Sequence, residues 1–199
     1  MVDEQILRRG IADPRLLDAL RKIPRHLFIP ESQRAHAYED RALGVGHGQT
    51  ISQPYMVALM LNALALEGTE KVLEVGTGSG YQAALLSQLA AEVHTVEIIS
   101  ELAIQAQALL GAYSNVHVHT ADGARGWPER APYDAILVAA ATPRVQAAWK
   151  EQLTKKGKLI LPLGSGARET LTLLERRSEE FREERLGECS FVPLTGEAG

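Results

Sequence analysis

Glycines at alternate positions follow a short apolar run near the middle of the sequence. The run covers residues 71–75 (Lys-Val-Leu-Glu-Val), and residues 76–80 read Gly-Thr-Gly-Ser-Gly. An apolar run bounded by glycines predicts a buried strand, and Ser79 with Gln82 has the spacing of a capping box that starts a helix. A strand, a glycine turn and a helix N-terminus let a ligand approach bare backbone at the positive end of a helix dipole. The stretch predicts a site for a nucleotide-like cofactor; the alternative is an ordinary strand–turn–helix with solvent-facing acids.

Two acidic residues near the glycines indicate which cofactor this is. Glu97 closes the next apolar pattern, about 20 positions after the glycines, where an acid suits a ribose diol. Glu74 lies inside the first strand, where an acid suits a positively charged ligand better than a pyrophosphate. S-adenosylmethionine carries an ammonium, a carboxylate, a ribose and a sulfonium. Dinucleotide folds use Gly-x-Gly-x-x-Gly, whereas the spacing here is Gly-x-Gly-x-Gly, so the pattern favours S-adenosylmethionine, with NAD as the alternative.

Two further stretches follow predicted secondary structure at positions that suit a site. Asp122 and Gly123 end a later strand, where the acid could accept from an adenine amino group and the glycine could let the ring approach. A plain β-turn is the alternative, because Asp-Gly is a common turn pair. The glycine-rich loop 44–49 leads to Ser52, whose position before Pro54 favours a helix N-cap, although a capping hydroxyl can also face a cleft.

The histidines do not suggest a metal site. His117 and His119 share one strand face, but no Cys, Asp or Glu at suitable spacing joins them, so we expect a solvent-facing strand edge and no metal. His47 in the glycine loop is expected to be exposed or hydrogen-bonded rather than catalytic.

Composition limits the classes of protein that remain. The chain has 199 residues, 45% of them hydrophobic and 23% charged, which predicts one domain with a full core. The net charge of −4 gives no basic field for nucleic acid. Cys189 is the only cysteine, residues 1–10 lack the apolar core of a signal peptide, and no run approaches a transmembrane length. We expect a cytoplasmic protein, a monomer, with no nucleic-acid or membrane partner.

Apolar runs alternate with helical patterns from residue 71 onward. The expected strands cover residues 71–75, 92–96, 116–119, 133–139, 158–162, 169–175 and 181–192. This alternation predicts an α/β fold with a doubly wound, mostly parallel, seven-stranded Rossmann-like sheet and a C-terminal antiparallel hairpin. Residues 1–66 are expected to form an N-terminal helical cap and substrate loop over the cofactor-binding core 67–199, with a helix starting at Asp13-Pro14 and an extended segment at 24–30.

Six stretches resemble the protein-L-isoaspartate (D-aspartate) O-methyltransferase family, over nearly the full length. They are residues 48–54 (Gly-Gln-Thr-Ile-Ser-Gln-Pro), 73–80, 122–123, 131–136, 157–162 and 191–195. The glycine motif at 76–80 is shared by most class I methyltransferases, whereas Thr-Ile-Ser-x-Pro and the terminal Val-Pro-Leu-Thr are much more specific to this family.

The resemblance implies a role for each candidate site residue. Ser52 would be the active-site residue, and substrate contacts would come from Gln49, Thr50, Ile51 and Thr195. The residues that would contact the cofactor are Glu74, Gly76, Thr77, Gly78, Ser79, Glu97, Asp122 and Gly123.

The activity that the resemblance implies is methyl transfer from S-adenosylmethionine to the free α-carboxylate of L-isoaspartyl residues, which initiates repair of damaged proteins and peptides. D-Aspartyl residues are a further candidate substrate. A carboxylate is already ionised near pH 7, so no general base is needed and Ser52 would only orient it. The alternatives are a methyltransferase for a small-molecule carboxylate, a non-catalytic cofactor-binding protein and a nicotinamide dehydrogenase.

Overall fold

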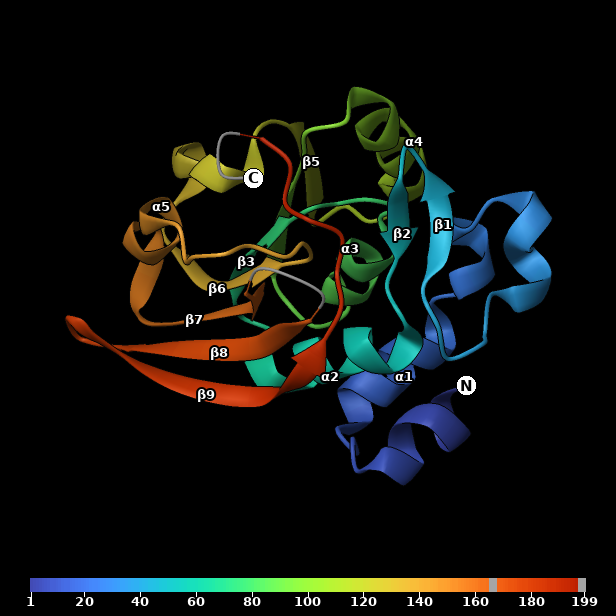
Figure 1. The fold of residues 1–199 in the computed structure, drawn as a ribbon, viewed down its shortest axis with the longest axis horizontal. Helices are drawn as coiled ribbons and strands as arrows, with labels where there is room; N and C mark the ends of the chain where they lie inside the picture. Colours follow the sequence, from blue (N-terminus) through green and yellow to red (C-terminus); the bar gives the residue numbers. More distant parts are fainter. Residues whose placement is uncertain (165–167, 197–199) are drawn as a thin grey trace.

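The computed structural model describes residues 1–164 and 168–196, and these form a mixed sheet flanked by helices (Figure 1). The strands of the main sheet are β3 (Lys71–Val75), β4 (Glu92–Glu97), β5 (Val116–Thr120), β6 (Tyr133–Val138), β7 (Leu153–Leu163), β8 (Glu169–Arg177) and β9 (Glu180–Cys189). Two more strands, β1 (Leu43–Gly46) and β2 (Gln49–Ile51), form a separate antiparallel hairpin. The α-helices are α1 (Pro14–Lys22), α2 (Pro54–Leu64), α3 (Tyr81–Leu86), α4 (Ser100–Leu110) and α5 (Ala147–Glu151).

The strands of the main sheet are ordered β5-β4-β3-β6-β7-β8-β9. The neighbours from β5 to β7 pair in parallel, and β8 and β9 add antiparallel pairs at the other end. Parallel neighbours need a crossover connection, which the intervening helices supply, whereas the short turn between β8 and β9 allows only a hairpin. The predicted mostly parallel seven-stranded sheet with a closing antiparallel hairpin is confirmed.

The central strands are buried on both faces. Val72 and Leu137 belong to a cluster that includes side chains of α1, α2 and α3, whereas Leu73 and Ile136 pack in a second cluster with Trp149 of α5. Because neighbouring residues of a strand point to opposite faces, the alternation places one helical layer on each side of the sheet.

The N-terminal segment packs against the first of these faces and gathers at one side of the molecule (Figure 1, blue). Helix α1 begins as predicted, because the Asp13 carboxylate accepts hydrogen bonds from the backbone N–H groups of Arg15 and Leu16 at 2.8 and 3.3 Å. The same segment also contains four short helices. Two precede α1, η1 (Val2–Ile6) and η2 (Leu7–Arg9), and two follow it, η3 (Arg25–Phe28) and η4 (Glu31–His36).

The prediction that residues 24–30 are extended is wrong. Residues Arg25–Phe28 form the 3₁₀ helix η3, which Leu27 N–H closes by donating to the Pro24 carbonyl at 3.0 Å. Pro30 restricts only the residue before it, and Ile29 is indeed extended at φ −126° and ψ 139°. The two prolines therefore limit the turn without preventing it.

The glycine-rich loop forms the tip of the β1–β2 hairpin. Gly46, His47 and Gly48 have φ values of +99°, +52° and +71°, so three successive residues occupy the left-handed region. Glycine adopts this conformation without a Cβ clash, which explains the composition of the loop. His47 is exposed at the tip, in agreement with the expectation for it.

The predicted capping box at Ser79 is wrong, because α3 begins two residues later, at Tyr81. Gly80 is its N-cap, with a φ of +84°, and its N–H closes a turn by donating to the Thr77 carbonyl at 2.9 Å. Ser79 Oγ accepts a 3.3 Å bond from the Tyr81 N–H, but Gln82 makes no reciprocal bond. Residues 77–80 therefore form a turn that precedes the helix.

Within the described ranges, no helix has the length and apolar character that crossing a bilayer requires.

Candidate active site

A cleft opens where β3 and β4 end, between the glycine turn, the β1–β2 hairpin and the segment that follows β9. Its empty space, including the open solvent at its mouth, is about 750 Å³. Its walls are formed by Gln49, Thr50, Ile51, Ser52, Val57, Glu74, Val75, Gly76, Thr77, Gly78, Ser79, Tyr81, Gln82, Val96, Glu97, Ile98, Gly123, Ala139, Ala140, Val192, Pro193, Leu194 and Thr195. Twelve of the thirteen predicted site residues are among them, and Asp122 is the exception.

The glycine turn presents backbone to this cleft. Gly76 and Thr77 donate their N–H groups to the Val96 carbonyl at 2.9 and 3.2 Å, which ties the turn to β4. Gly76 and Gly78 have φ values of +92° and +52°, and a Cβ built on Gly78 would meet nothing within 4 Å. The requirement for glycine at 78 is therefore conformational, and the space beside it is open to a ligand.

Glu97 is fixed by the turn that it faces. Its Oε2 accepts from the Gly78 N–H at 2.8 Å and its Oε1 from the Ile99 N–H at 3.0 Å. Each carboxylate oxygen has a second lone pair, so Glu97 can still accept from the hydroxyl groups of a ligand.

Glu74 is fully buried on β3, beneath the glycine turn. Its Oε2 accepts from Thr95 Oγ1 at 2.5 Å, and Thr95 Oγ1 in turn lies 2.6 Å from Thr77 Oγ1. Its Oε1 has no partner within the described part of the chain. Burial, and to a smaller extent the charge of Glu97, raise the pKa of Glu74 to about 8 against the opposing effect of the Thr95 bond.

The unpartnered groups fit the amino-acid end of S-adenosylmethionine. Glu74 Oε1 is an acceptor that suits an ammonium, and Gln82 Nε2, also buried and without a partner among the described residues, is a donor that suits a carboxylate. Both side chains line the cleft, so the residues present fit this cofactor.

Gly123 lines the cleft, whereas Asp122 borders a neighbouring hollow. A Cβ on Gly123 would come within 2.5 Å of Val75 Cγ1, so no side chain fits there. Asp122 Oδ1 accepts from the Ala124 N–H at 2.9 Å and caps the short helix η5 (Gly123–Arg125). The turn that was the alternative for this pair is therefore present, and a contact of Asp122 with adenine stays a prediction.

Ser52 lies between the hairpin and α2, and it is not the N-cap that its spacing favoured. Helix α2 begins at Pro54 with Gln53 as its N-cap and no side-chain capping bond. The Tyr55 N–H at the second position of the helix donates to Asp40 Oδ1 at 3.3 Å, so it does not need the Ser52 hydroxyl. Ser52 is instead half-buried in the wall of the cleft.

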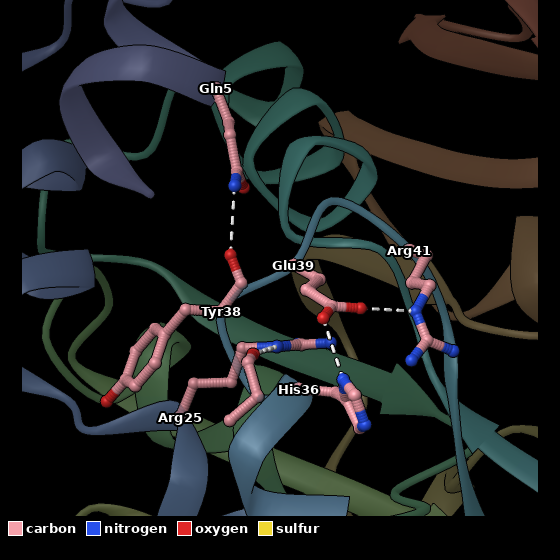
Figure 2. Close-up of polar contacts among 7 residues, drawn as sticks. Gln5, Arg25, His36, Tyr38, Glu39 and Arg41 are labelled. Carbon is pink, nitrogen blue, oxygen red and sulfur yellow. Dashed lines mark hydrogen bonds and ion pairs between the residues drawn. The ribbon is translucent and has the colours of Figure 1, made fainter.

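Arg25 holds the Ser52 backbone, a role that no pattern in the sequence indicates. Its guanidinium is fully buried and donates from Nε to the Ala37 carbonyl at 2.9 Å and from Nη2 to the Ser52 carbonyl at 2.8 Å. Figure 2 shows Arg25 beside the backbone around Tyr38, which Gln5 holds from the other side through a 2.9 Å bond to the Tyr38 carbonyl. The N-terminal segment is thereby connected to the loop that carries Ser52.

The charge of Arg25 lies next to the cleft wall. Its guanidinium carbon is 5.1 Å from the ring centroid of Tyr81, a cleft residue, and its Nη1 has no partner in the described part of the chain. Burial lowers the pKa of Arg25 to about 10, although Tyr81, Tyr38 and Asp40 oppose the shift. An arginine between two prolines carries no periodicity that would reveal such burial.

The C-terminal segment forms the wall opposite the hairpin. Ala141 N–H donates to the Val192 carbonyl at 2.8 Å, and Leu194 N–H donates to the Ala141 carbonyl at 2.7 Å. These bonds attach the segment to the end of β6, and Figure 1 shows it in red running from β9 alongside the hairpin. Thr195, near the end of this segment, lines the cleft.

His94, His117 and His119 lie together on one face of the sheet, and none of the three lines the cleft. His117 is exposed on the edge strand β5 as expected, but His119 is half-buried and stacks on Trp127 at 4.2 Å between centroids. His94 on β4 approaches His119 at 3.0 Å between ring nitrogens. Across the described ranges, no group of three or more His, Cys, Asp or Glu side chains is arranged to hold a metal ion.

A doubly wound sheet with a cleft at the glycine turn after β3 is a Rossmann-like architecture, and its class is the class I methyltransferase fold. Solved structures agree with this class. A protein-L-isoaspartate O-methyltransferase matches all of this chain and 67% of its own with a TM-score of 0.91 and 28% identity. A Plasmodium falciparum beta-aspartate methyltransferase, solved in complex with S-adenosyl-L-homocysteine, has a TM-score of 0.85 at 24% identity and covers 98% of this chain and 96% of that one.

Sequence comparison identifies the family. The protein-L-isoaspartate(D-aspartate) O-methyltransferase family matches residues 1–199. The protein-L-isoaspartate O-methyltransferase of Roseiflexus castenholzii is 53% identical over 193 residues, which cover 96% of this chain and 88% of that protein. Protein-L-isoaspartate O-methyltransferase 2 of Marinobacter nauticus is 49% identical and covers 100% and 93%. The chain belongs to the protein-L-isoaspartate O-methyltransferase family.

Proposed function

We propose that this protein transfers the methyl group of S-adenosylmethionine to the free α-carboxylate of L-isoaspartyl residues, which starts the repair of damaged proteins and peptides. The observation that carries the proposal is that two sequence features meet in one cleft. The loop at Ser52 that is specific to the family and the glycine turn with Glu74 and Glu97 line the same space.

The residues around the glycine turn would hold the cofactor. Glu74 Oε1 would pair with its ammonium, Gln82 Nε2 would donate to its carboxylate, and Glu97 would accept from its ribose hydroxyls. Gly123 would present bare backbone to the adenine. When bound, S-adenosylmethionine supplies an electrophilic methyl group on a positively charged sulfur.

The residues of the loop and the C-terminal segment would align the acceptor. An isoaspartyl carboxylate is ionised near pH 7, so no residue needs to remove a proton from it. Ser52 would donate a hydrogen bond that orients one carboxylate oxygen, with Gln49, Thr50, Ile51 and Thr195 around the peptide. Burial between these walls would exclude water, which favours a step in which opposite charges neutralise each other.

The remaining features of the proposal concern the setting in which the enzyme acts. Substrates would be exposed, flexible segments, because a backbone carboxylate has to enter the cleft. We propose that the chain acts as a cytoplasmic monomer, without nucleic acid, and that residues 1–66 form the cap and substrate loop over the core 67–199. Cys189, the lone cysteine, is free and buried, which suits a reducing compartment.

The proposal is tested by transfer of radiolabelled methyl groups to two peptides that differ only in an isoaspartyl or an aspartyl residue. We expect base-labile label on the isoaspartyl peptide and background on its aspartyl twin. Equal labelling of both peptides, or labelling of small carboxylic acids alone, would refute the substrate assignment. Tight binding of S-adenosylhomocysteine without turnover on any peptide would instead indicate a non-catalytic binding protein.

A further inference from the structure

Two threonine hydroxyls connect the buried carboxyl of Glu74 with the glycine turn. Thr95 stands directly opposite Glu74 in the parallel pairing of β4 with β3, and its Oγ1 lies 2.5 Å from Glu74 Oε2 and 2.6 Å from Thr77 Oγ1. Thr95 is fully buried and is not part of the cleft wall, whereas Thr77 is. The chain of hydroxyls therefore runs from the interior of the sheet to the cleft.

The other neighbours of Glu74 do little to stabilise its charge. On the β6 side the residue opposite Glu74 is Leu137, which has no donor in its side chain. Helices α2 and α3, which cover this face of the sheet, contain no Asp, Glu, His, Lys or Arg.

Two other titratable side chains line the cleft with Glu74. The charge of Glu97 raises the pKa of Glu74, and burial raises the pKa of Tyr81 well above its usual value. Neither offers a positive charge to the carboxylate. Within the described residues, the Thr95 hydroxyl is therefore the side-chain group that hydrogen-bonds to Glu74.

The chain of hydroxyls can run in either direction, and the protonation state of Glu74 decides which. When Glu74 is ionised, Thr95 donates to its Oε2 and Thr77 donates to Thr95. When Glu74 is protonated, its O–H donates to Thr95, which then donates to Thr77. A hydroxyl both donates and accepts, so Thr95 pairs with Glu74 in both states by rotating its O–H. Ionisation moves one proton, from Glu74 to solvent.

We propose that Thr95 is a positioning residue for the cofactor's ammonium, because its hydroxyl holds Glu74 Oε2 within the sheet, leaves Oε1 for the ammonium and stabilises the ionised carboxylate that the ammonium requires. The inference rests on the proposed function. Oε1 has no partner within the described part of the chain. The Thr95 bond lowers the pKa of Glu74 against the larger effect of burial, so its loss raises that pKa.

Thr95→Val tests this role, because it removes the hydroxyl and keeps the shape. We expect its dissociation constant for S-adenosylhomocysteine to exceed that of wild type about tenfold at pH 7 and about twofold at pH 9, since at high pH Glu74 ionises without the bond. The ratio of the two constants cancels the titration of the ligand's own amino group. The same ratio at both pH values would indicate a structural defect and would overturn the inference.

A conservative variant and a matched control accompany this measurement. Thr95→Ser keeps the donor and should bind within about twofold of wild type at both pH values. Thr172→Val, on β8, should not change the affinity, although Thr172 is also a buried strand threonine whose hydroxyl donates, to the Thr170 carbonyl at 3.1 Å. Binding by Thr95→Ser that is as weak as that of Thr95→Val would overturn the inference.

The Glu74 carboxyl is also followed without a ligand, through the pH dependence of its ¹³C chemical shift. We expect the midpoint to lie about 1 pH unit higher in Thr95→Val than in wild type, and to be unchanged in Thr95→Ser. A midpoint that is the same in wild type and Thr95→Val would overturn the inference while the proposed function stands. Failure of wild-type protein to bind S-adenosylhomocysteine at either pH would refute the proposed function and the inference together.

Discussion

Buried polar side-chain atoms without a partner are concentrated around the cleft. Within the described residues there are five such atoms, and those of Glu74, Tyr81 and Gln82 belong to cleft residues. Leaving a buried donor or acceptor unpaired costs about 1–3 kcal/mol. A ligand that pairs with these atoms removes that cost, so the same residues that destabilise the free protein favour the complex.

The pKa of Glu74 predicts that ligand binding releases a proton. With a pKa of about 8, the carboxyl is mostly protonated near pH 7 and must ionise to pair with an ammonium. Affinity for S-adenosylhomocysteine should therefore rise with pH up to about 8, by at most about tenfold per pH unit. Calorimetry in buffers with different ionisation enthalpies measures the released proton directly.

Glu74→Gln is the matched control for that experiment, because it keeps the shape and removes the titration. We expect its affinity to be independent of pH in this range and weaker than wild type at pH 8, by about tenfold. Wild-type binding that takes up a proton, or that does not respond to pH, would show that Glu74 does not meet the ammonium.

Ser52→Ala should lower methyl transfer by about 10²-fold and change the affinity for S-adenosylhomocysteine by no more than about twofold, since it removes one aligned donor. Initial rates on an isoaspartyl peptide and calorimetry measure the two quantities. Ser32→Ala, on the exposed helix η4, is the control for a serine hydroxyl elsewhere. Full activity in Ser52→Ala would exclude Ser52 from the mechanism.

At the scale of elements, the cleft depends on segments that are distant in sequence. The glycine turn belongs to the sheet, the hairpin β1–β2 carries the substrate loop, and the segment after β9 forms the opposite wall. Arg25 on η3 joins the N-terminal segment to the loop through the carbonyls of Ala37 and Ser52. The position of Ser52 is therefore controlled by an element that does not itself line the cleft.

Arg25 is a positioning residue for Ser52 on this argument. Arg25→Lys should lower kcat about tenfold or more, because a single ammonium cannot reproduce the fork that bridges two carbonyls. The KM for peptide and the affinity for S-adenosylhomocysteine should change by no more than about twofold. Arg21→Lys, on the exposed face of α1, is the control. A wild-type kcat in Arg25→Lys, or a parallel loss of cofactor affinity, would contradict a positioning role.

At the scale of the whole molecule, stability should depend on the neutral histidines of the outer strands. Burial, followed by the nearby His94 and His117, lowers the pKa of His119 to about 4, and burial also lowers the pKa of His94. Glu129 opposes the shift of His119, and Arg130 adds to it. A side chain that must stay neutral in the fold links stability to pH.

The sign of this linkage follows from the two pKa values of His119. The unfolded chain has a histidine pKa of about 6.5 and binds the proton first, so stability is full above about pH 6.5 and falls as pH decreases toward 4. We expect the melting temperature to decrease between pH 7 and 5 in scanning calorimetry, and less so in His119→Gln. His36→Gln, on an exposed surface helix, is the control. An equal decrease in His119→Gln and wild type would place the effect elsewhere.

The sequence by itself determined the sheet and the position of the cofactor turn, because both depend on local patterns. Buried strands such as 71–75 read as apolar runs, and the glycines of 76–80 mark a backbone conformation that other residues avoid. Local spacing also misled, since Ser79 and Ser52 have the positions of caps but serve a turn and a cleft wall. Only the tertiary structure decided that Arg25 supports Ser52 and that Gln82 and Glu74 carry unpaired atoms. Those features arise from contacts between residues that are far apart in the chain, and no periodicity records such contacts.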